Sequence, residues 1–357
     1  MKIFFKNYLG VVLLAGCLLP NIAFATVLTE AEQNEIPNYK EAKVDIKKDG
    51  PVLLFSDSPE MVTKCGVMYR DTAYGDVRLF FHHVNDTKSA KRLAIVLHNP
   101  GIRPVEVTVG RKGVSAPSHD WLNAGKIAQS SYFKEANEYK FNIKPGGNLE
   151  FLTGEKGQIF KPQDLITGIV DFHFSRPVEV SFMMIPVGTA FSAAVSEYDV
   201  LPPDKGEYVL RGTFKNANRH ITFLDIFNND KKDVLGITLA DNKKDLYARG
   251  IDATTGNSVI NYGNYGVVYN LYYKTKGEGN AFLRFNPWGG TFAGACILEN
   301  EDKRTEINVP TNRIYFGDKR PNENMVLKKI VGKTVGKVFF SPPGSSNLPV
   351  RIFLEAD

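Results

Sequence analysis

The sequence predicts an all-β protein made of two immunoglobulin-like β-sandwich domains in tandem. Apolar and polar residues alternate with a period of two in both halves of the chain, for example over residues 105–109 and 350–354, which is typical of half-buried strands. Turn residues separate such segments at intervals of roughly 8–12 positions. Only one segment, about residues 118–134, has the pattern of a helix packed on the first domain.

Residues 1–25 have the organisation of a secretory signal peptide. Lys2 and Lys6 precede an apolar stretch over residues 8–19, and small residues lead up to Ala25, as at a signal-peptidase site. The stretch is shorter than the roughly 20 residues that span a bilayer. We expect cleavage after Ala25, export to the periplasm, cell envelope or extracellular space, and no integral membrane span in the mature chain.

A second interpretation of the same region involves Cys17. Residues 14–17, Leu-Ala-Gly-Cys, also match a bacterial lipobox, in which Cys17 is lipidated and anchors the mature protein. The residues after Cys17 continue the apolar run, whereas a lipid-bearing cysteine is usually followed by a polar tether. This favours cleavage after Ala25, although both interpretations predict export.

Charge argues against nucleic acid as a partner. The formal net charge is +5, and removal of Lys2 and Lys6 with the signal peptide lowers it to +3. A dedicated nucleic-acid-binding protein normally concentrates basic residues on one face. The expected partners are an envelope polymer or another envelope protein.

The expected domain order places a polar segment at 26–48, a first β-sandwich at 49–201, a linker at 202–206 and a second β-sandwich at 207–357. The linker contains Pro202 and Pro203, which do not fit a central strand. In the predicted helix, Ser118 is a suitable N-cap and Asp120 suits the positive end of the helix dipole. The halves also share an order of motifs, over residues 74–101 and 265–287, that suggests distant duplication.

Two cysteines remain after cleavage at Ala25. Cys65 and Cys296 lie in opposite halves of the chain. An oxidising compartment permits a disulfide between them, but we favour the interpretation that they are two small buried residues without a bridge.

The sequence lacks recognisable catalytic and metal-binding motifs, so we expect a non-catalytic protein without a cofactor. His82 and His83 are adjacent on a predicted strand, so they point to opposite faces and cannot hold one metal ion together. The chain contains no nucleophile elbow, P-loop or dinucleotide fingerprint. Paired carboxylates for glycoside hydrolysis stay open, because such acids can come from distant segments.

An aromatic and glycine-rich region suggests the alternative function of carbohydrate binding or processing. Aromatic rings flanked by amides stack on sugar rings and bond their hydroxyls. The candidate ligand-binding residues are Trp121, Tyr262, Tyr265 and Trp288. Tyrosine also suits strand interiors, so a purely structural role is the competing interpretation.

Residues 78–85, 98–101 and 113–118 resemble secreted Firmicutes-type proteins with copper amine oxidase N-terminal-like, or stalk, domains. The resemblance covers about residues 60–200. It implies a cell-envelope protein rather than an oxidase, because residues 258–263 lack the threonine and the acid of the oxidase cofactor motif. The leading hypothesis is therefore an exported envelope or surface protein with a structural or binding role.

Overall fold

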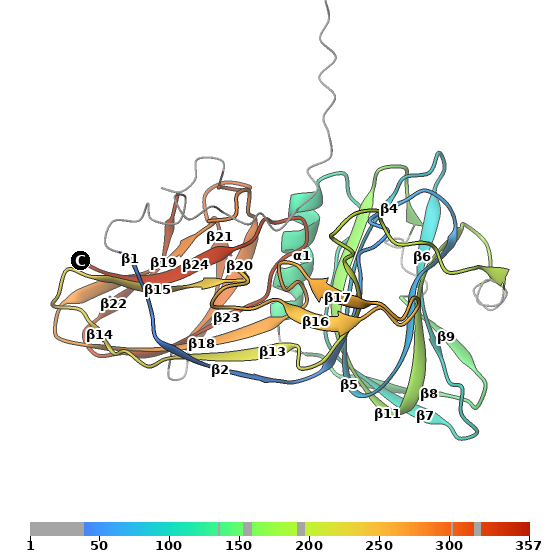
Figure 1. Cartoon of the computed structure of the whole chain (residues 1–357), viewed down its shortest axis with the longest axis horizontal. Coiled ribbons are helices and arrows are strands. Elements are labelled where there is room, and N and C mark those ends of the chain that lie inside the picture. The colour runs from blue at the N-terminus through green and yellow to red at the C-terminus, as the bar shows by residue number, and fades with distance from the viewer. Residues whose placement is uncertain (1–38, 135, 153–158, 191–196, 301–302, 318–322) are drawn as a thin grey trace, which may run out of the picture.

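The computed structural model describes residues 39–357 except 135, 153–158, 191–196, 301–302 and 318–322. These residues form strands β1 to β24 and a single α-helix, α1, and they fold into two lobes (Figure 1). The all-β, sandwich-like class predicted from the sequence is confirmed. Ala25 and Cys17 lie outside the described residues. No helix in the described ranges is long and apolar enough to cross a membrane.

The first lobe is a single sheet of twelve strands. Its path runs β10-β6-β11-β5-β3-β12-β16-β17, with β4, β7, β8 and β9 attached to it. The strands are β3 (Val52–Ser56), β4 (Met61–Val62), β5 (Gly66–Asn85), β6 (Lys91–His98), β7 (Val105–Val114), β8 (Tyr139–Ile143), β9 (Asn148–Phe151), β10 (Ile159–Phe160), β11 (Leu165–Pro186), β12 (Arg211–Phe214), β16 (Ala248–Ile251) and β17 (Ser258–Asn261).

This sheet folds over on itself along its two longest strands. β5 and β11 pair in antiparallel fashion, and their register shifts between Phe174 and Val178. The first half of β11 pairs with β7 and the second half with β6, so two layers face each other. The alternating residues Val105, Val107 and Val109 point into the core between these layers, as their period of two predicts.

The second lobe is a sandwich of two sheets around one core. One sheet has the order β1-β15-β24-β19-β22 and the other β2-β13-β18-β23-β20-β21, with β14 beside β18. The strands are β1 (Tyr39–Glu41), β2 (Val44–Asp49), β13 (Asn218–Phe223), β14 (Phe227–Asn228), β15 (Val234–Leu239), β18 (Val268–Lys276), β19 (Asn280–Asn286), β20 (Gly294–Asn300), β21 (Lys303–Val309), β22 (Met325–Val331), β23 (Val335–Phe340) and β24 (Val350–Ala356).

The sheets exchange strands across the expected linker at 202–206. β1 and β2, from the N-terminal end, pair with β15 and β13 of the second lobe. Conversely, β12, which follows the linker, pairs with β3 of the first lobe. β16 pairs with β12, and β17 pairs with β16, so these two strands also belong to the sheet of the first lobe. The predicted boundary therefore does not coincide with a division between hydrogen-bonded sheets.

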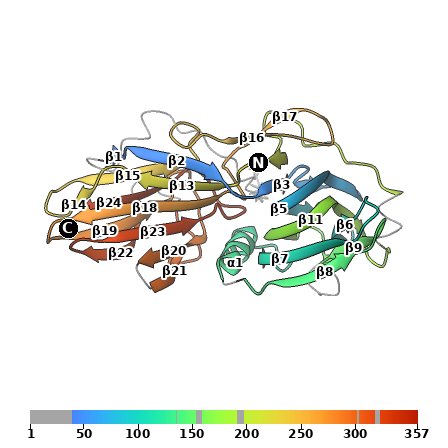
Figure 2. The ribbon, with the colours of Figure 1, turned by 90° about the horizontal axis from the view of Figure 1, so that it is seen from below.

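Helix α1 (Trp121–Phe133) lies at the junction of the lobes (Figure 2). It contacts β7 and β11 of the first lobe and also β20 of the second. The helix begins three residues later than expected, because Ser118 is extended and bridges Leu165. Asp120, not Ser118, is the N-cap, and its carboxylate accepts from the backbone N–H of Asn123 at 3.1 Å.

Candidate ligand-binding pocket

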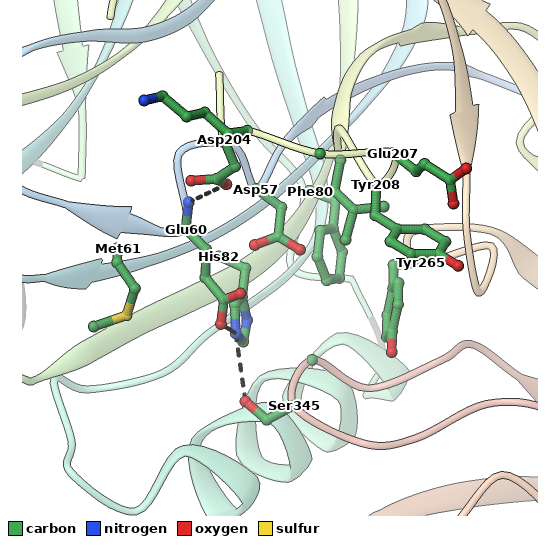
Figure 3. A pocket seen from close by; sticks show the side chains of 14 residues that line it. Asp57, Glu60, Met61, Phe80, His82, Asp204, Glu207, Tyr208, Tyr265 and Ser345 are labelled. Atoms are coloured by element: carbon green, nitrogen blue, oxygen red, sulfur yellow. Dashed lines mark hydrogen bonds and ion pairs between the residues drawn. The ribbon is translucent and has the colours of Figure 1, made fainter. Parts of the chain in front are cut away.

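A cavity of about 580 Å³ opens between the two lobes. Figure 3 shows Asp57, Glu60 and Asp204 with His82 on one side of it, and the aromatic rings with Glu207 on the other. Five separate segments of the chain supply its walls. The lining residues are Asp57, Glu60, Met61, Phe80, His82, Asp204, Lys205, Gly206, Glu207, Tyr208, Leu210, Tyr265, Gly344 and Ser345.

The loop between β3 and β4 carries two of the acids and is held by the linker. Ser58 Oγ donates to Asp204 Oδ2 at 3.0 Å, and the backbone N–H of Glu60 donates to the same oxygen at 2.9 Å. The backbone N–H of Asp204 donates in turn to Ser58 Oγ at 2.8 Å. Asp204 is thus a structural acceptor that fixes Asp57 and Glu60 against the cavity.

Asp57 is a buried carboxylate whose oxygen lacks a partner. The residue is 8% exposed, and its Oδ1 accepts no hydrogen bond within the part of the chain that the structure describes. Burial raises the pKa of Asp57 well above its usual value, and the charges of Glu60 and Asp204 add to this. An unpartnered buried carboxylate is costly for a folded protein.

Glu60 is the second perturbed acid. Burial, followed by repulsion from Asp204, raises the pKa of Glu60 to about 7. Its Oε1 lies 3.9 Å from His82 Nε2. Glu60 therefore changes charge near neutral pH, which an ordinary glutamate does not.

His82 does not supply the missing positive charge. Burial, followed by repulsion from the neighbouring His83, lowers the pKa of His82 to about 3, so the ring is neutral at physiological pH. Its Nε2 lies 3.4 Å from Ser345 Oγ. Its Nδ1 has no hydrogen-bond partner among the described residues.

A serine–histidine pair lies behind this wall. Ser56 Oγ and His83 Nε2 are 2.9 Å apart, and His83 Nδ1 is 2.9 Å from the carbonyl oxygen of Pro59. Both side chains are fully buried, and neither lines the cavity. The pair therefore braces the Asp57–Glu60 loop from inside, which fits a structural role better than attack on a substrate.

The opposite wall is aromatic. Phe80 and Tyr265 have ring centroids 6.1 Å apart, and the Tyr265 hydroxyl donates to the Ser346 carbonyl at 2.8 Å. Tyr208, at 39% exposure, lies at the rim. Its ring meets Tyr262 edge-on with centroids 4.6 Å apart.

The four aromatic residues proposed from the sequence have different places. Tyr265 lines the pocket, and Tyr262 contacts the rim residue Tyr208. Trp121 packs with Met61 in a small cluster beside the pocket, and its Nε1 donates to the Gln163 carbonyl at 3.1 Å. Trp288 is 2% exposed, and Arg351 lies 3.6 Å from the centre of its ring. The four do not form one exposed patch, because Tyr265 and Trp288 are buried.

Sequence reasoning missed the acids of this pocket. Asp57, Glu60 and Asp204 fall in loops, where acids are ordinary, and about 140 positions separate the last from the others. The only available signal was the pair of acids flanking Ser58-Pro59 after a buried strand.

Two other expectations concern cysteine and metal. Cys65 and Cys296 are free, the first half-buried and the second buried, so the disulfide considered above is not formed. Burial raises the pKa of both thiols. Among the described residues, no group of three or more His, Cys, Asp or Glu side chains is arranged to hold a metal ion.

A second cleft, of about 680 Å³, also lies between the lobes, but two of its acids, Asp171 and Glu299, are paired with cations. Arg78 Nε donates to Asp171 Oδ1 at 2.7 Å, and Arg78 Nη1 donates to the Ala217 carbonyl at 3.0 Å. Glu299 is within 3.0 Å of Arg304 and 2.8 Å of Lys337. This cleft therefore differs from the first pocket in having a cation for these acids.

Comparisons with known proteins do not assign the chain. No family model matches it, and no curated protein matches it. One solved structure that it resembles is the CUB1-EGF-CUB2 domain of human MASP-1/3, at 10% identity, covering 81% of this chain and 99% of that one, with a TM-score of 0.18. Another is the N-terminal CBM22-1-CBM22-2 tandem domain of Paenibacillus barcinonensis Xyn10C, at 9% identity, 87% and 91% coverage and a TM-score of 0.16. At such TM-scores neither likeness supports a conclusion about function, and the resemblance to copper amine oxidase N-terminal-like proteins stays a prediction.

Proposed function

We propose that this chain is an exported, non-catalytic binding protein of the cell envelope that holds a small ligand in the pocket between its lobes. The ligand is either a free small molecule or a side group of an envelope polymer. The observation that carries the proposal is a pair of buried polar atoms, Asp57 Oδ1 and His82 Nδ1, that have no hydrogen-bond partner among the described residues and belong to side chains lining a cavity of about 580 Å³. Export rests on the signal-peptide features of residues 1–25.

A ligand explains these atoms better than a purely structural role does. Buried polar groups in folded proteins almost always have a partner, and pockets that bind small molecules combine apolar walls with a few polar groups. Here the apolar wall is formed by Met61, Phe80 and Leu210, and the polar groups are Asp57 and His82.

The test is a thermal-shift and calorimetry screen of the full mature protein against defined amines, sugars and carboxylates. We expect at least one compound class to raise the melting temperature of the wild type. Asp57→Leu should abolish that shift, while Glu278→Gln, at an exposed site that does not line the pocket, should leave it unchanged. Absence of any shift, or a shift that survives in Asp57→Leu, would overturn the proposal.

Carbohydrate binding or processing is the second candidate, favoured by one observation in particular. Tyr208 lies at the pocket rim against Tyr262, and Glu60, with a pKa of about 7, would be partly protonated at neutral pH, as a general acid must be. Retention on peptidoglycan or soluble glycans that Tyr208→Ala weakens would support binding. Release of reducing ends that Glu60→Gln abolishes would support processing, and absence of both would exclude this candidate.

A further inference from the structure

The charges that line the pocket are unbalanced toward the acidic side. Asp57, Glu60, Asp204 and Glu207 are its acids, Lys205 is its only lysine or arginine, and His82 is neutral. Lys205 is exposed, and no described ion pair joins it to an acid of the pocket. The buried Asp57 and the half-buried Glu60 therefore face the cavity without a cation to compensate them.

A buried cation, Arg211, contacts the loop that carries Asp57, since its Nη1 donates to the Ser58 carbonyl at 3.3 Å, but its charge is already paired with another acid. Arg211 is fully buried and donates to Asp252 Oδ2 at 3.0 Å. Its Nη1 donates to the carbonyls of Met68 and Leu201, both at 2.9 Å. Arg211 therefore braces the wall behind the pocket and leaves Asp57 without a partner.

The carboxylates of the pocket differ in whether their oxygens already accept hydrogen bonds from the protein. Asp204 Oδ2 accepts from Ser58 and from the backbone of Glu60. Asp57 Oδ1 accepts no hydrogen bond within the described residues. Glu60 Oε1 lies 3.9 Å from Nε2 of the neutral His82 ring. Two carboxylates, Asp57 and Glu60, thus remain to receive donors from a ligand.

We infer that the ligand is an organic ammonium compound, with its charged nitrogen at Asp57 and Glu60 and its carbon body against Met61, Phe80 and Tyr265. This inference rests on the proposed binding function and names the ligand class of that pocket. An ammonium group offers three donors and no acceptor, which suits a site of carboxylates. The aromatic wall provides both apolar contact and ring faces that attract a cation.

Two other ligand types fit the lining less well. A divalent metal ion needs several oxygen ligands in a compact shell, and the described residues contain no such group of three. A neutral sugar would supply hydroxyl donors, but it would leave both carboxylates without a compensating charge in a buried site.

The experiment is isothermal titration calorimetry at pH 8 on the full mature protein, with matched probes. The cationic probes are n-pentylammonium, 1,5-pentanediammonium and benzylammonium. The neutral probes are 1-pentanol, benzyl alcohol and N-acetylglucosamine, and the anionic probe is pentanoate. At pH 8 the amines stay protonated, since their pKa values are near that of lysine. We expect at least one ammonium to bind ten-fold or more tightly than its neutral counterpart.

Matched variants locate the binding. Asp57→Asn should weaken ammonium binding by about 10- to 100-fold, while Glu278→Gln should leave it unchanged; melting temperatures check that both variants fold.

Equal binding of ammonium and alcohol probes, or an unchanged affinity in Asp57→Asn, would overturn the ammonium assignment. If a neutral probe binds, Asp57→Leu abolishes its binding and no ammonium probe binds, the ligand class would be refuted while the binding function stays intact. Failure of every probe to bind would count against both.

Discussion

Two aspartates with similar burial have opposite acid–base behaviour in this protein. Asp252 is 1% exposed and Asp57 is 8% exposed. Burial acts to raise the pKa of Asp252, but hydrogen bonds from Thr254 and the charge of Arg211 outweigh it, so that its pKa is lowered. The pKa of Asp57 is raised by burial, with the charges of Glu60 and Asp204 adding to it.

The difference shows which acids serve the fold and which are available to a ligand. Asp245 resembles Asp252: it pairs with Arg219 and accepts from the Tyr269 hydroxyl at 2.6 Å. These two acids are satisfied within the chain and stabilise it. Asp57 and Glu60 destabilise the empty pocket when charged, which is the expected cost of a site arranged for a partner.

Breaking a satisfied pair should have the largest effect. Arg211→Met leaves Asp252 charged and buried, and it also removes the donors to the carbonyls of Met68 and Leu201. We expect a loss of about 3–5 kcal/mol in the free energy of unfolding, measured by urea denaturation. Lys40→Met, at the exposed pair with Asp233, is the control and should cost about 1 kcal/mol or less. Similar effects of the two variants would remove the basis of the comparison.

The same substitution should change the stability of the protein differently at the two aspartates. Asp252→Asn should destabilise the protein by about 2–3 kcal/mol, because it weakens charge-assisted hydrogen bonds to Arg211. Asp57→Asn should leave stability unchanged or raise it by about 1 kcal/mol at pH 8, because it replaces a buried acid whose Oδ1 has no hydrogen-bond partner among the described residues. Thermal unfolding of both variants at pH 8 measures this, and destabilisation by Asp57→Asn to the same extent would show that Asp57 serves the fold.

Glu60 should make stability depend on pH near neutrality. Its pKa rises from 4.5 to about 7 on folding, so the folded state holds the proton more tightly. Its stabilising contribution is fully present below pH 4.5 and is lost as the pH rises through about 7. Glu60→Gln should remove up to about 3 kcal/mol of this decline, which urea denaturation between pH 5 and 8 measures. An identical pH profile in the variant would contradict the assignment.

Removal of the rim aromatic should have the smallest effect. Tyr208→Ala should weaken binding of a cationic probe by about 2- to 5-fold, the magnitude of an exposed cation–π contact, with little change in melting temperature. Tyr74→Ala, at an exposed site that does not line the pocket, is the control. An effect of Tyr74→Ala equal to that of Tyr208→Ala would show that the rim ring makes no specific contact.

The sequence predicted the local structure better than its assembly. The alternation at Val105, Val107 and Val109 identified a real strand with the correct buried face, because side-chain period depends only on neighbouring residues. The exchange of β1, β2 and β12 between lobes depends on long-range pairing, for which composition and spacing carry no signal.

The pocket was less predictable than the fold for the same reason. The aromatic wall was partly anticipated through Tyr265, because aromatic residues beside glycine are conspicuous in a sequence. The acids were not, since the charge compensation of Asp57 depends on where Arg211 and Asp204 lie in three dimensions. Only the structure distinguishes a matched carboxylate such as Asp252 from an unmatched one.

The titration of the Glu60 carboxyl group tests the central claim most directly. Carbon-13 NMR of glutamate-labelled protein, assigned by difference with Glu60→Gln, would follow this group with and without a saturating ammonium probe. We predict a pKa of about 7 in the free protein and a clear decrease on saturation, because a bound cation favours the charged carboxylate. A pKa near 4.5 in the free protein, or a value that saturation with the probe leaves unchanged, would contradict an acidic pocket arranged for a cation.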